Sequence, residues 1–316
     1  MPSHEPAGDA ADVLSRPAAR RRRALLIVNA KARQGTCPPD ELAAELEAAG
    51  LAVRRAECGR REELSDLIRR DAGDADVVVI GGGDGTLSAA AAGLAEVGVP
   101  LAILPLGTAN DLARTLGIPQ DIGAAARLAA SGTVRRIDLG EVNGVPFFNV
   151  ASIGLSVELA RALTRDMKRR WGKLGYAVAA VRVLARMRPF RAEVRVDGEV
   201  HRVKSVQIGV GNGRHYGGGM TIEESAAPDD GRLDVYSIDV NHWWELPLLY
   251  PAFRAGRHGR RDNVHVWMGE AAEVVTKRPL PVNTDGEITT RTPARFRVRP
   301  GAVRVVCPPS RAAGRP

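Results

Sequence analysis

The chain has 316 residues, of which 44% are hydrophobic and 26% are charged, a composition typical of soluble globular proteins rather than disordered or membrane-embedded ones. Its net charge of +8 favours polyanionic partners such as nucleic acid, anionic lipid headgroups or nucleotides. The aromatic content of only 4% disfavours a protein that stacks single-stranded bases. The three cysteines are scattered, which excludes a disulfide framework and favours a reducing compartment.

Strand-like and helix-like segments alternate from residue 24 to residue 116. Strands are predicted at 24–29, 51–56, 76–81 and 101–104, and helices at 40–49, 61–70, 86–95 and 109–116. This alternation with short connections predicts an α/β domain with a doubly wound parallel sheet. Residues 1–22 have no hydrophobic periodicity and mix Pro, Ala and Arg, so we expect a disordered basic tail there.

The pattern changes after about residue 134. Strands rich in Val and Arg are predicted at 134–152, 190–210, 232–240, 262–276 and 294–307, with one helix near 171–188. We therefore predict a nucleotide-binding domain at 23–133 and a β-rich, sandwich-like domain at 134–309, followed by a short tail at 310–316. The last strand or strands of this second domain could pass back into the first domain. No low-complexity linker separates the two halves, so a cleft between them is expected.

A glycine-rich motif, IGGGDGT, occupies Ile80–Thr86 between a buried strand and an Ala-rich helix. Glycines let the backbone approach a phosphate closely, and the helix N-terminus offers free N–H groups to an anion. Asp84 could organise a cation or orient a nucleophile, and Thr86 could cap the helix. The loop lacks the Gly-Lys-Ser/Thr of a Walker A motif and the dinucleotide-binding spacing G-x-G-x-x-G. The alternative is a glycine turn that only fits a tight strand-to-helix junction.

A second loop, LPLGTAND, follows the next predicted strand at 104–111. Two such loops at the carboxyl ends of neighbouring strands mark the place where open parallel sheets bind ligands. We expect Thr108, Asn110 and Asp111 to lie over that place. Taken alone, this segment could equally be an ordinary helix start after a Pro turn.

Three further segments rich in turn residues lie in the β-rich half. The segments are GVGNGRHYGGG at 209–219, APDDGRLD at 227–234, and NTDGE at 283–287. Each could be no more than a hairpin turn. The Asp-Gly-Glu turn is expected to leave the carboxylates of Asp285 and Glu287 unburied, because Gly286 permits a sharp bend.

Taken in this order, the motifs GGGDGT, PLGTAND, GNGRHYGGG with PDDGRLD, and TDGE resemble those of the diacylglycerol kinase catalytic family. That family includes bacterial soluble lipid kinases and the sphingosine and ceramide kinases. The resemblance runs from about residue 24 to residue 308. NAD kinases and phosphofructokinases are more distant relatives that share only the glycine-Asp-Gly loop.

The resemblance implies phosphorylation of a lipid hydroxyl, diacylglycerol-like or ceramide-like, that depends on ATP and Mg²⁺. Glu287 matches the proposed general base, and Asp84 is its rival for that role. Asp230, with main-chain oxygens of Ala227 and Arg232, matches a structural magnesium site. The positions that match nucleotide contacts are Asn29, Gly82, Gly83, Asp84, Gly85, Thr86, Leu87, Ser88, Thr108, Asn110 and Asp111. The chain departs from the family where Ala30 replaces Pro after Asn29, and where Ser88-Ala89 replaces Asn-Glu.

Two alternatives remain at this point: a kinase of a soluble substrate, of the NAD kinase type, and a non-catalytic relative that binds lipid or nucleotide. The PLGTAND and TDGE motifs disfavour the first, and the retained acidic residues Asp84, Asp111, Asp230 and Glu287 disfavour the second. No recognised DNA-binding motif is present, so no nucleic-acid partner is expected. A basic stretch at 161–173 is either a solvated helix face or a region drawn to an anionic leaflet, at about 1 kcal/mol per basic residue. We therefore expect a cytoplasmic protein with peripheral membrane association.

Overall fold

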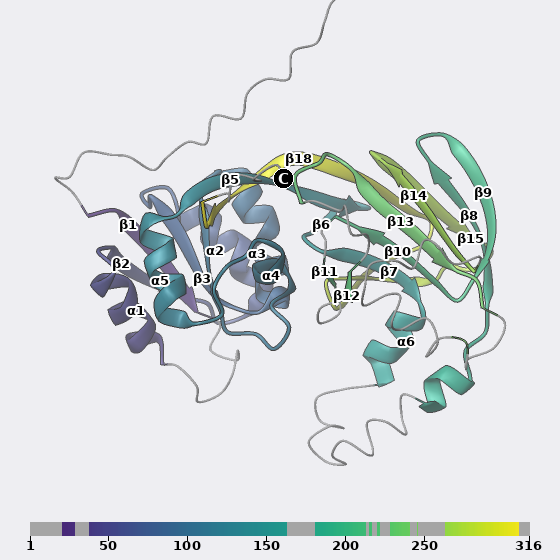
Figure 1. Cartoon of the computed structure of the whole chain (residues 1–316), viewed down its shortest axis with the longest axis horizontal. Coiled ribbons are helices and arrows are strands. Elements are labelled where there is room, and N and C mark those ends of the chain that lie inside the picture. The colour runs from purple at the N-terminus through teal and green to yellow at the C-terminus, as the bar shows by residue number, and fades with distance from the viewer. Residues whose placement is uncertain are drawn as a thin grey trace, which may run out of the picture.

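The computed structural model describes residues 21–28, 38–162, 181–212, 228–240 and 263–309, together with 215–216, 220–221 and 245. The chain forms two lobes (Figure 1). The first lobe contains the strands β1 (Arg23–Val28), β2 (Ala52–Glu57), β3 (Val77–Gly82) and β4 (Leu101–Pro105). These strands are parallel neighbours in the order β2-β1-β3-β4. Every residue of β3 and β4 is buried, as expected of parallel strands covered on both faces.

Helices cover both faces of this parallel sheet. They are α1 (Pro39–Ala48), the short 3-10 turn η1 (Arg61–Glu63), α2 (Leu64–Asp71), α3 (Asp84–Val97), α4 (Asp111–Thr115) and α5 (Ile122–Ser131). The apolar side chains of α2 and α3 join one buried cluster, and those of α1 and α5 join another on the opposite face. The doubly wound α/β domain predicted from the sequence is confirmed.

The second lobe is a sandwich of two sheets. Its elements are β5 (Thr133–Val142), β6 (Val145–Phe147), β7 (Val150–Gly154), α6 (Leu155–Ala162), β8 (Phe190–Val196), β9 (Glu199–Ser205), β10 (Gln207–Gly211), β11 (His215–Tyr216), β12 (Met220–Thr221), β13 (Leu233–Ile238), β14 (Val264–Gly269), β15 (Ala271–Thr276), β16 (Pro281–Thr284), β17 (Glu287–Arg291) and β18 (Ala294–Cys307). One sheet is antiparallel in the order β14-β13-β10-β7-β16-β17. Buried apolar side chains of this sheet pack with those of β8, β15 and β18, which confirms the β-rich, sandwich-like prediction.

The last strand, β18, belongs to both lobes (Figure 1). Near its start it pairs with β15, and over most of its length it pairs with β5. Near its end Val305 lies beside Leu101 of β4, in parallel orientation. The ten-stranded sheet therefore continues from the first lobe into the sandwich of the second lobe.

Local structure differs from the sequence-based expectations at several points. Helices α5 and α6 were not predicted from the sequence. Most of the helix predicted at 171–188 lies outside the described residues, although 181–185 are helical. Gly83, not Thr86, is the N-cap residue of α3, and no side chain caps that helix.

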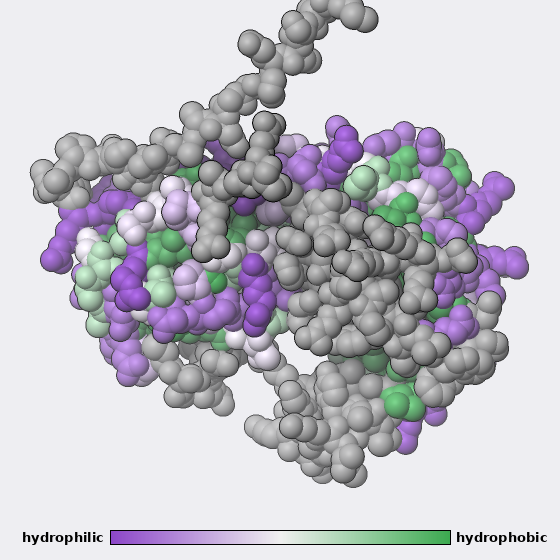
Figure 2. Space-filling model, viewed as in Figure 1, coloured by the Kyte–Doolittle hydropathy of each residue, from purple (hydrophilic) through white to green (hydrophobic). Residues whose placement is uncertain are grey.

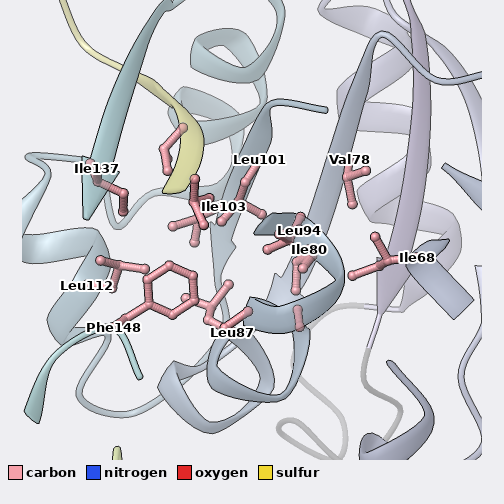
Figure 3. Close-up of a cluster of buried hydrophobic side chains, with 14 of the residues drawn as sticks. Ile68, Val78, Ile80, Leu87, Leu94, Leu101, Ile103, Leu112, Ile137 and Phe148 are labelled. Carbon is pink, nitrogen blue, oxygen red and sulfur yellow. The ribbon is translucent and has the colours of Figure 1, made fainter. Parts of the chain in front are cut away.

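The core of the first lobe also takes in residues of β5 and β18 and Phe148 of the second lobe. Phe148, which follows β6, is buried together with Leu87 of α3 and Leu112 of α4 (Figure 3). The described surface in one view is mostly hydrophilic, with scattered apolar side chains (Figure 2). Among the described residues, no helix is long and apolar enough to cross a membrane.

Candidate active site

The loops that follow β3 and β4 lie against each other. The N–H of Leu106 donates a hydrogen bond to the carbonyl oxygen of Gly82, at 3.0 Å. A Cβ atom built on Gly107 would lie 2.5 Å from the Cα of Gly83, and one built on Gly83 would lie 2.8 Å from the Cα of Gly107. Real Cβ atoms do not approach so closely, so both positions require glycine. The two sequence motifs thus form one continuous backbone surface at the carboxyl edge of the parallel sheet.

Asp84 connects this surface to α4. As the first residue of α3, Asp84 accepts a hydrogen bond at its Oδ1 from the N–H of Leu112, at 3.1 Å. Asn110 adopts a left-handed backbone conformation, and its Nδ2 donates to Gly107 O at 3.1 Å and to Gln120 Oε1 at 2.9 Å. Within the described part of the chain, the buried Oδ1 of Asn110 has no hydrogen-bond partner. This acceptor beside the glycine loops fits a ligand that carries hydroxyl or amino groups, as a nucleotide does.

Not every predicted nucleotide contact points toward the loops. Thr108 is exposed, whereas the side chain of Leu87 is in the apolar core, so Leu87 could contact a ligand only through its main chain. Thr86 is buried, and a Cβ on Gly82 would lie 2.6 Å from the Cβ of Thr86. Asp111 is also buried. Asn29 lies outside the described residues.

The turn between β16 and β17 reaches the same region from the second lobe. Asp285 and Gly286 both have positive φ angles, of 47° and 99°, as a two-residue hairpin turn requires. The Asp285 carboxylate accepts hydrogen bonds from the N–H groups of Phe148, Asn149 and Val150, at 2.8, 2.9 and 3.1 Å. The turn therefore holds the connection between β6 and β7 in place.

Burial raises the pKa of Asp285 to about 6, against an ordinary value of 3.8. The three backbone hydrogen bonds oppose this shift, and the negative charge of Asp84 adds to it. The expectation that both carboxylates of this turn are unburied is therefore wrong for Asp285, because its side chain turns inward to the backbone of the β6–β7 connection. Phe148, whose N–H donates to Asp285, packs with Leu87 of α3, the helix that begins with Asp84, so the two predicted loops, one from each lobe, lie close together.

Glu287 lies two residues further on, at the start of β17, and forms an ion pair with Arg61 of η1. The Glu287 side chain is 49% exposed and that of Arg61 is 31% exposed. A Cβ on Gly85 would lie 2.5 Å from Nη1 of Arg61. The guanidinium group therefore lies between the first turn of α3 and the Glu287 carboxylate. The sequence analysis did not single out Arg61, although an Arg pair shortly after β2, at the carboxyl edge of the sheet, was a usable signal.

The predicted magnesium ligands lie elsewhere in the second lobe. Asp230 accepts a hydrogen bond from the N–H of Arg232 at 3.0 Å, and Ala227 lies outside the described residues. Close to Asp230 is the buried Asp138 of β5, which accepts from the N–H groups of Gly231 and Gly301, each at 2.7 Å. Burial raises the pKa of Asp138, and the charge of Asp230 adds to this effect. The sequence analysis missed Asp138, although an acidic residue inside a strand with buried apolar neighbours could have indicated it.

Oxygen donors that would suit Mg²⁺ are thus present at two places, the facing Asp84 and Asp285, and the neighbouring Asp138 and Asp230. In the ranges that the structure describes, no three His, Cys, Asp or Glu side chains are grouped as a ready metal site. Any Mg²⁺ bound here would therefore need water, main-chain oxygen or phosphate oxygen as further ligands, which is usual for this ion.

Comparison with known proteins gives matches over both lobes. Residues 23–142 match the family described as "Diacylglycerol kinase catalytic domain", and residues 149–307 match "YegS C-terminal NAD kinase beta sandwich-like domain". A "Probable lipid kinase YegS-like" from Pseudomonas fluorescens is 36% identical over 238 residues, which are 73% of this chain and 77% of the relative. A protein of the same name from Pseudomonas aeruginosa is 34% identical over 273 residues, 81% of this chain and 89% of the relative.

A crystal structure of a diacylglycerol kinase from Bacillus anthracis str. Sterne has the same fold. It superposes with a TM-score of 0.75 at 28% sequence identity, covering 91% of this chain and 98% of that one. The two family matches together cover both lobes, and the second includes the turn that carries Asp285 and Glu287. The chain belongs to the diacylglycerol kinase catalytic family, and within it to the YegS-like proteins.

Proposed function

We propose that the protein is a lipid kinase that transfers the γ-phosphoryl group of ATP to the hydroxyl group of a membrane lipid. The observation that carries this proposal is the meeting of two loops from different lobes. The glycine-rich turn with Asp84 faces the turn with Asp285 and Glu287, and Arg61 bridges the two. Membership of a kinase family and the names of the relatives support the same reaction class.

The chemistry follows from these positions. Phosphoryl transfer depends mainly on positioning and on neutralising charge. The backbone around Gly83, Asp84 and Gly85, at the start of α3, presents the N–H groups that a phosphate binds at a helix N-terminus. Mg²⁺, when bound with the nucleotide, would neutralise phosphate charge, with Asp84 and Asp285 as the nearest oxygen donors.

Glu287 is the proposed general base. Its carboxylate is exposed, and within the described residues it accepts no backbone hydrogen bonds of the kind that hold Asp285. A hydroxyl group is a weak nucleophile, and a positioned base typically contributes 10²–10⁴-fold to the rate of such a step. Asp84 already accepts a hydrogen bond from Leu112, which favours a positioning or cation-binding role for it.

A lipid acceptor is favoured by the names of the relatives, which are probable lipid kinases and a diacylglycerol kinase. Diacylglycerol-like and ceramide-like acceptors both present a hydroxyl group to a carboxylate such as that of Glu287. NAD is the acceptor of the rival function, which the PLGTAND and TDGE motifs disfavour.

We further propose that the protein attaches reversibly to anionic membranes, since the net charge of +8 attracts negatively charged headgroups. Most of the basic stretch at 161–173 lies outside the described residues, and Arg161 at its start pairs with Glu158 at 3.3 Å.

The test is a kinase assay with labelled ATP and Mg²⁺ on diacylglycerol, monoacylglycerol, ceramide, a sphingoid base and phosphatidylglycerol in mixed micelles, with NAD as the soluble acceptor. We expect label in at least one lipid. Label in NAD alone would overturn the proposal in favour of the soluble-substrate kinase, and ATP binding without any transfer would favour a non-catalytic relative.

Two variants then assign the base. Glu287→Gln should lower kcat at least about 100-fold without weakening ATP binding, and Asp84→Asn should abolish turnover with the protein still folded. Glu270→Gln, in an exposed turn between β14 and β15, is the matched control and should leave kcat unchanged. A Glu287→Gln enzyme that keeps a tenth or more of the wild-type kcat would transfer the role of base to Asp84.

A further inference from the structure

Arg61 lies where the glycine-rich turn of the first lobe meets the Glu287 turn of the second. Its guanidinium group lies against the first turn of α3 at Gly85 and pairs with Glu287 across the lobes. The other described groups at this place are the carboxylates of Asp84, Asp285 and Glu287, and a polyphosphate brings further negative charge. Because like charges at close range repel each other, the positive charge of Arg61 favours the binding of a polyphosphate here.

The ion pair with Glu287 is of a kind that opens easily. Both side chains are partly exposed, at 31% and 49%, and solvent-screened pairs of this type contribute little to stability. A guanidinium group binds phosphate with two parallel N–H···O bonds. A polyphosphate on the glycine loop therefore competes well with a single exposed carboxylate for Arg61. By contrast, Arg114 of α4 donates its Nε to the carbonyl oxygen of Ala109 at 2.8 Å, which commits it to the second loop.

We propose that Arg61 exchanges partners during the reaction: it pairs with Glu287 before nucleotide binds, and with the γ-phosphate of ATP afterwards. This inference rests on the proposed lipid kinase function. Before ATP arrives, the ion pair occupies the lone pairs of the base. When the γ-phosphate draws Arg61 away, Glu287 becomes available to the lipid hydroxyl. The ion pair thus makes the base available only when the phosphoryl donor is present.

In the transfer step, the lipid oxygen forms a bond to the γ-phosphorus and gives its proton to Glu287. The bond between the γ-phosphorus and the oxygen that bridges to the β-phosphate breaks, and ADP leaves with that electron pair. Arg61 faces the γ-phosphoryl oxygens, where it stabilises the charge in the transition state. Glu287 then returns its proton to solvent and pairs with Arg61 again.

The neighbouring arginine supplies a matched control. Arg60 pairs with Glu63 of the same turn at 2.9 Å, and its side chain is 77% exposed. A change at Arg60 therefore removes one positive charge from the same segment without touching the glycine loop or Glu287.

The first experiment measures the affinities of ATP and ADP by calorimetry in the full chain, without lipid. Because Arg61 is assigned to the γ-phosphate, Arg61→Gln should weaken ATP binding roughly 10- to 100-fold, the usual range for a charge-assisted hydrogen bond, and leave ADP binding unchanged. Arg61→Lys keeps the charge and should recover part of this loss. Arg60→Gln should change neither affinity. Equal losses for ATP and ADP, or no loss for either, would overturn the proposal.

The second experiment tests the exchange itself. If Glu287 competes with ATP for Arg61, then Glu287→Gln should bind ATP more tightly than the wild type, by up to about fivefold, the worth of an exposed ion pair. The gain should vanish when Arg61→Gln is also present, and ADP binding should not change. A Glu287→Gln variant that gains as much affinity in the Arg61→Gln background as in the wild type would show that the two residues are not coupled.

Turnover separates this inference from the function on which it rests. If the wild type transfers phosphate to a lipid, and Arg61→Gln lowers both kcat and the preference for ATP over ADP, the lipid kinase function and the role of Arg61 are both supported. If the wild type is active and Arg61→Gln is as active, only the role of Arg61 fails. If the wild type phosphorylates no lipid, the proposed function fails, and the binding data still decide whether Arg61 contacts the γ-phosphate.

Discussion

Replacing Asp285 by Asn removes a buried carboxyl group whose pKa is raised from 3.8 to about 6. The difference of about 2 pKa units corresponds to about 3 kcal/mol in the free energy of unfolding. The sign follows from proton binding, because between these two values the folded protein holds a proton at Asp285 that the unfolded chain has released. The stabilising contribution of this carboxyl is complete below pH 3.8 and is lost as the pH rises to about 6.

The measurement is urea unfolding of the wild type and Asp285→Asn at a series of pH values from 4 to 7.5. Subtracting one free energy from the other cancels the titration of the carboxylates that both proteins share. We expect the wild type to lose up to about 3 kcal/mol relative to the variant between pH 4 and pH 6, with no further change at higher pH.

A second Asp-Gly turn provides the control. Asp197 and Gly198 also have positive φ angles, and the Asp197 carboxylate accepts hydrogen bonds from the N–H groups of Glu270 and Ala271. Asp197 is exposed, so Asp197→Asn removes no burial cost and serves as the control for losing the backbone hydrogen bonds of an Asp-Gly turn. A difference curve for Asp285→Asn that is flat, or that rises with pH, would refute the assignment of a buried, proton-binding carboxyl at this turn.

Three further predictions concern the contacts between the loops, the contact between the lobes, and the membrane. Gly107→Ala should cost about 1–3 kcal/mol in the free energy of unfolding, as overpacking does, and weaken ATP binding. The reason is that the new Cβ would lie 2.5 Å from the Cα of Gly83. Gly59→Ala is the control, because its Cβ would meet open space, and it should change neither stability nor ATP binding. Equal effects of the two substitutions would refute the close approach of Gly107 and Gly83. Phe148→Ala should cost about 3–5 kcal/mol in urea unfolding, since the ring is buried in the first lobe; a cost below 1 kcal/mol would exclude it from that core. Binding to phosphatidylglycerol vesicles in sedimentation assays should weaken as salt rises, because charges are screened over about 8 Å at physiological ionic strength. Neutralising Arg165, Lys168, Arg169 and Arg170 together should reduce this binding more than activity on a dispersed short-chain lipid; equal losses would place the stretch in the active site.

Much of the first lobe was predictable because its information is local. The apolar run of β3 and the glycines that follow it specify a buried strand, a tight turn and a helix start within a few consecutive residues. The same is true of the Asp-Gly turn before Glu287. Such patterns depend on backbone sterics and on the 2.0- and 3.6-residue periods of strands and helices. Helix α5 was missed although its amphipathic pattern is stronger than those of the predicted helices α1 and α3.

The sequence by itself thus determined the type of each lobe, the order of the motifs and the residues able to carry phosphoryl-transfer chemistry. Only the tertiary structure decided which of those residues meet. That Arg61 pairs with Glu287, that Asp285 turns inward to the backbone of Phe148, and that Asp138 lies beside Asp230 all depend on contacts between segments far apart in the chain. The strand β18 brings many of these segments together by pairing with both β15 and β4. Pairings of this kind follow from burying two apolar cores at once, and no local pattern encodes that requirement.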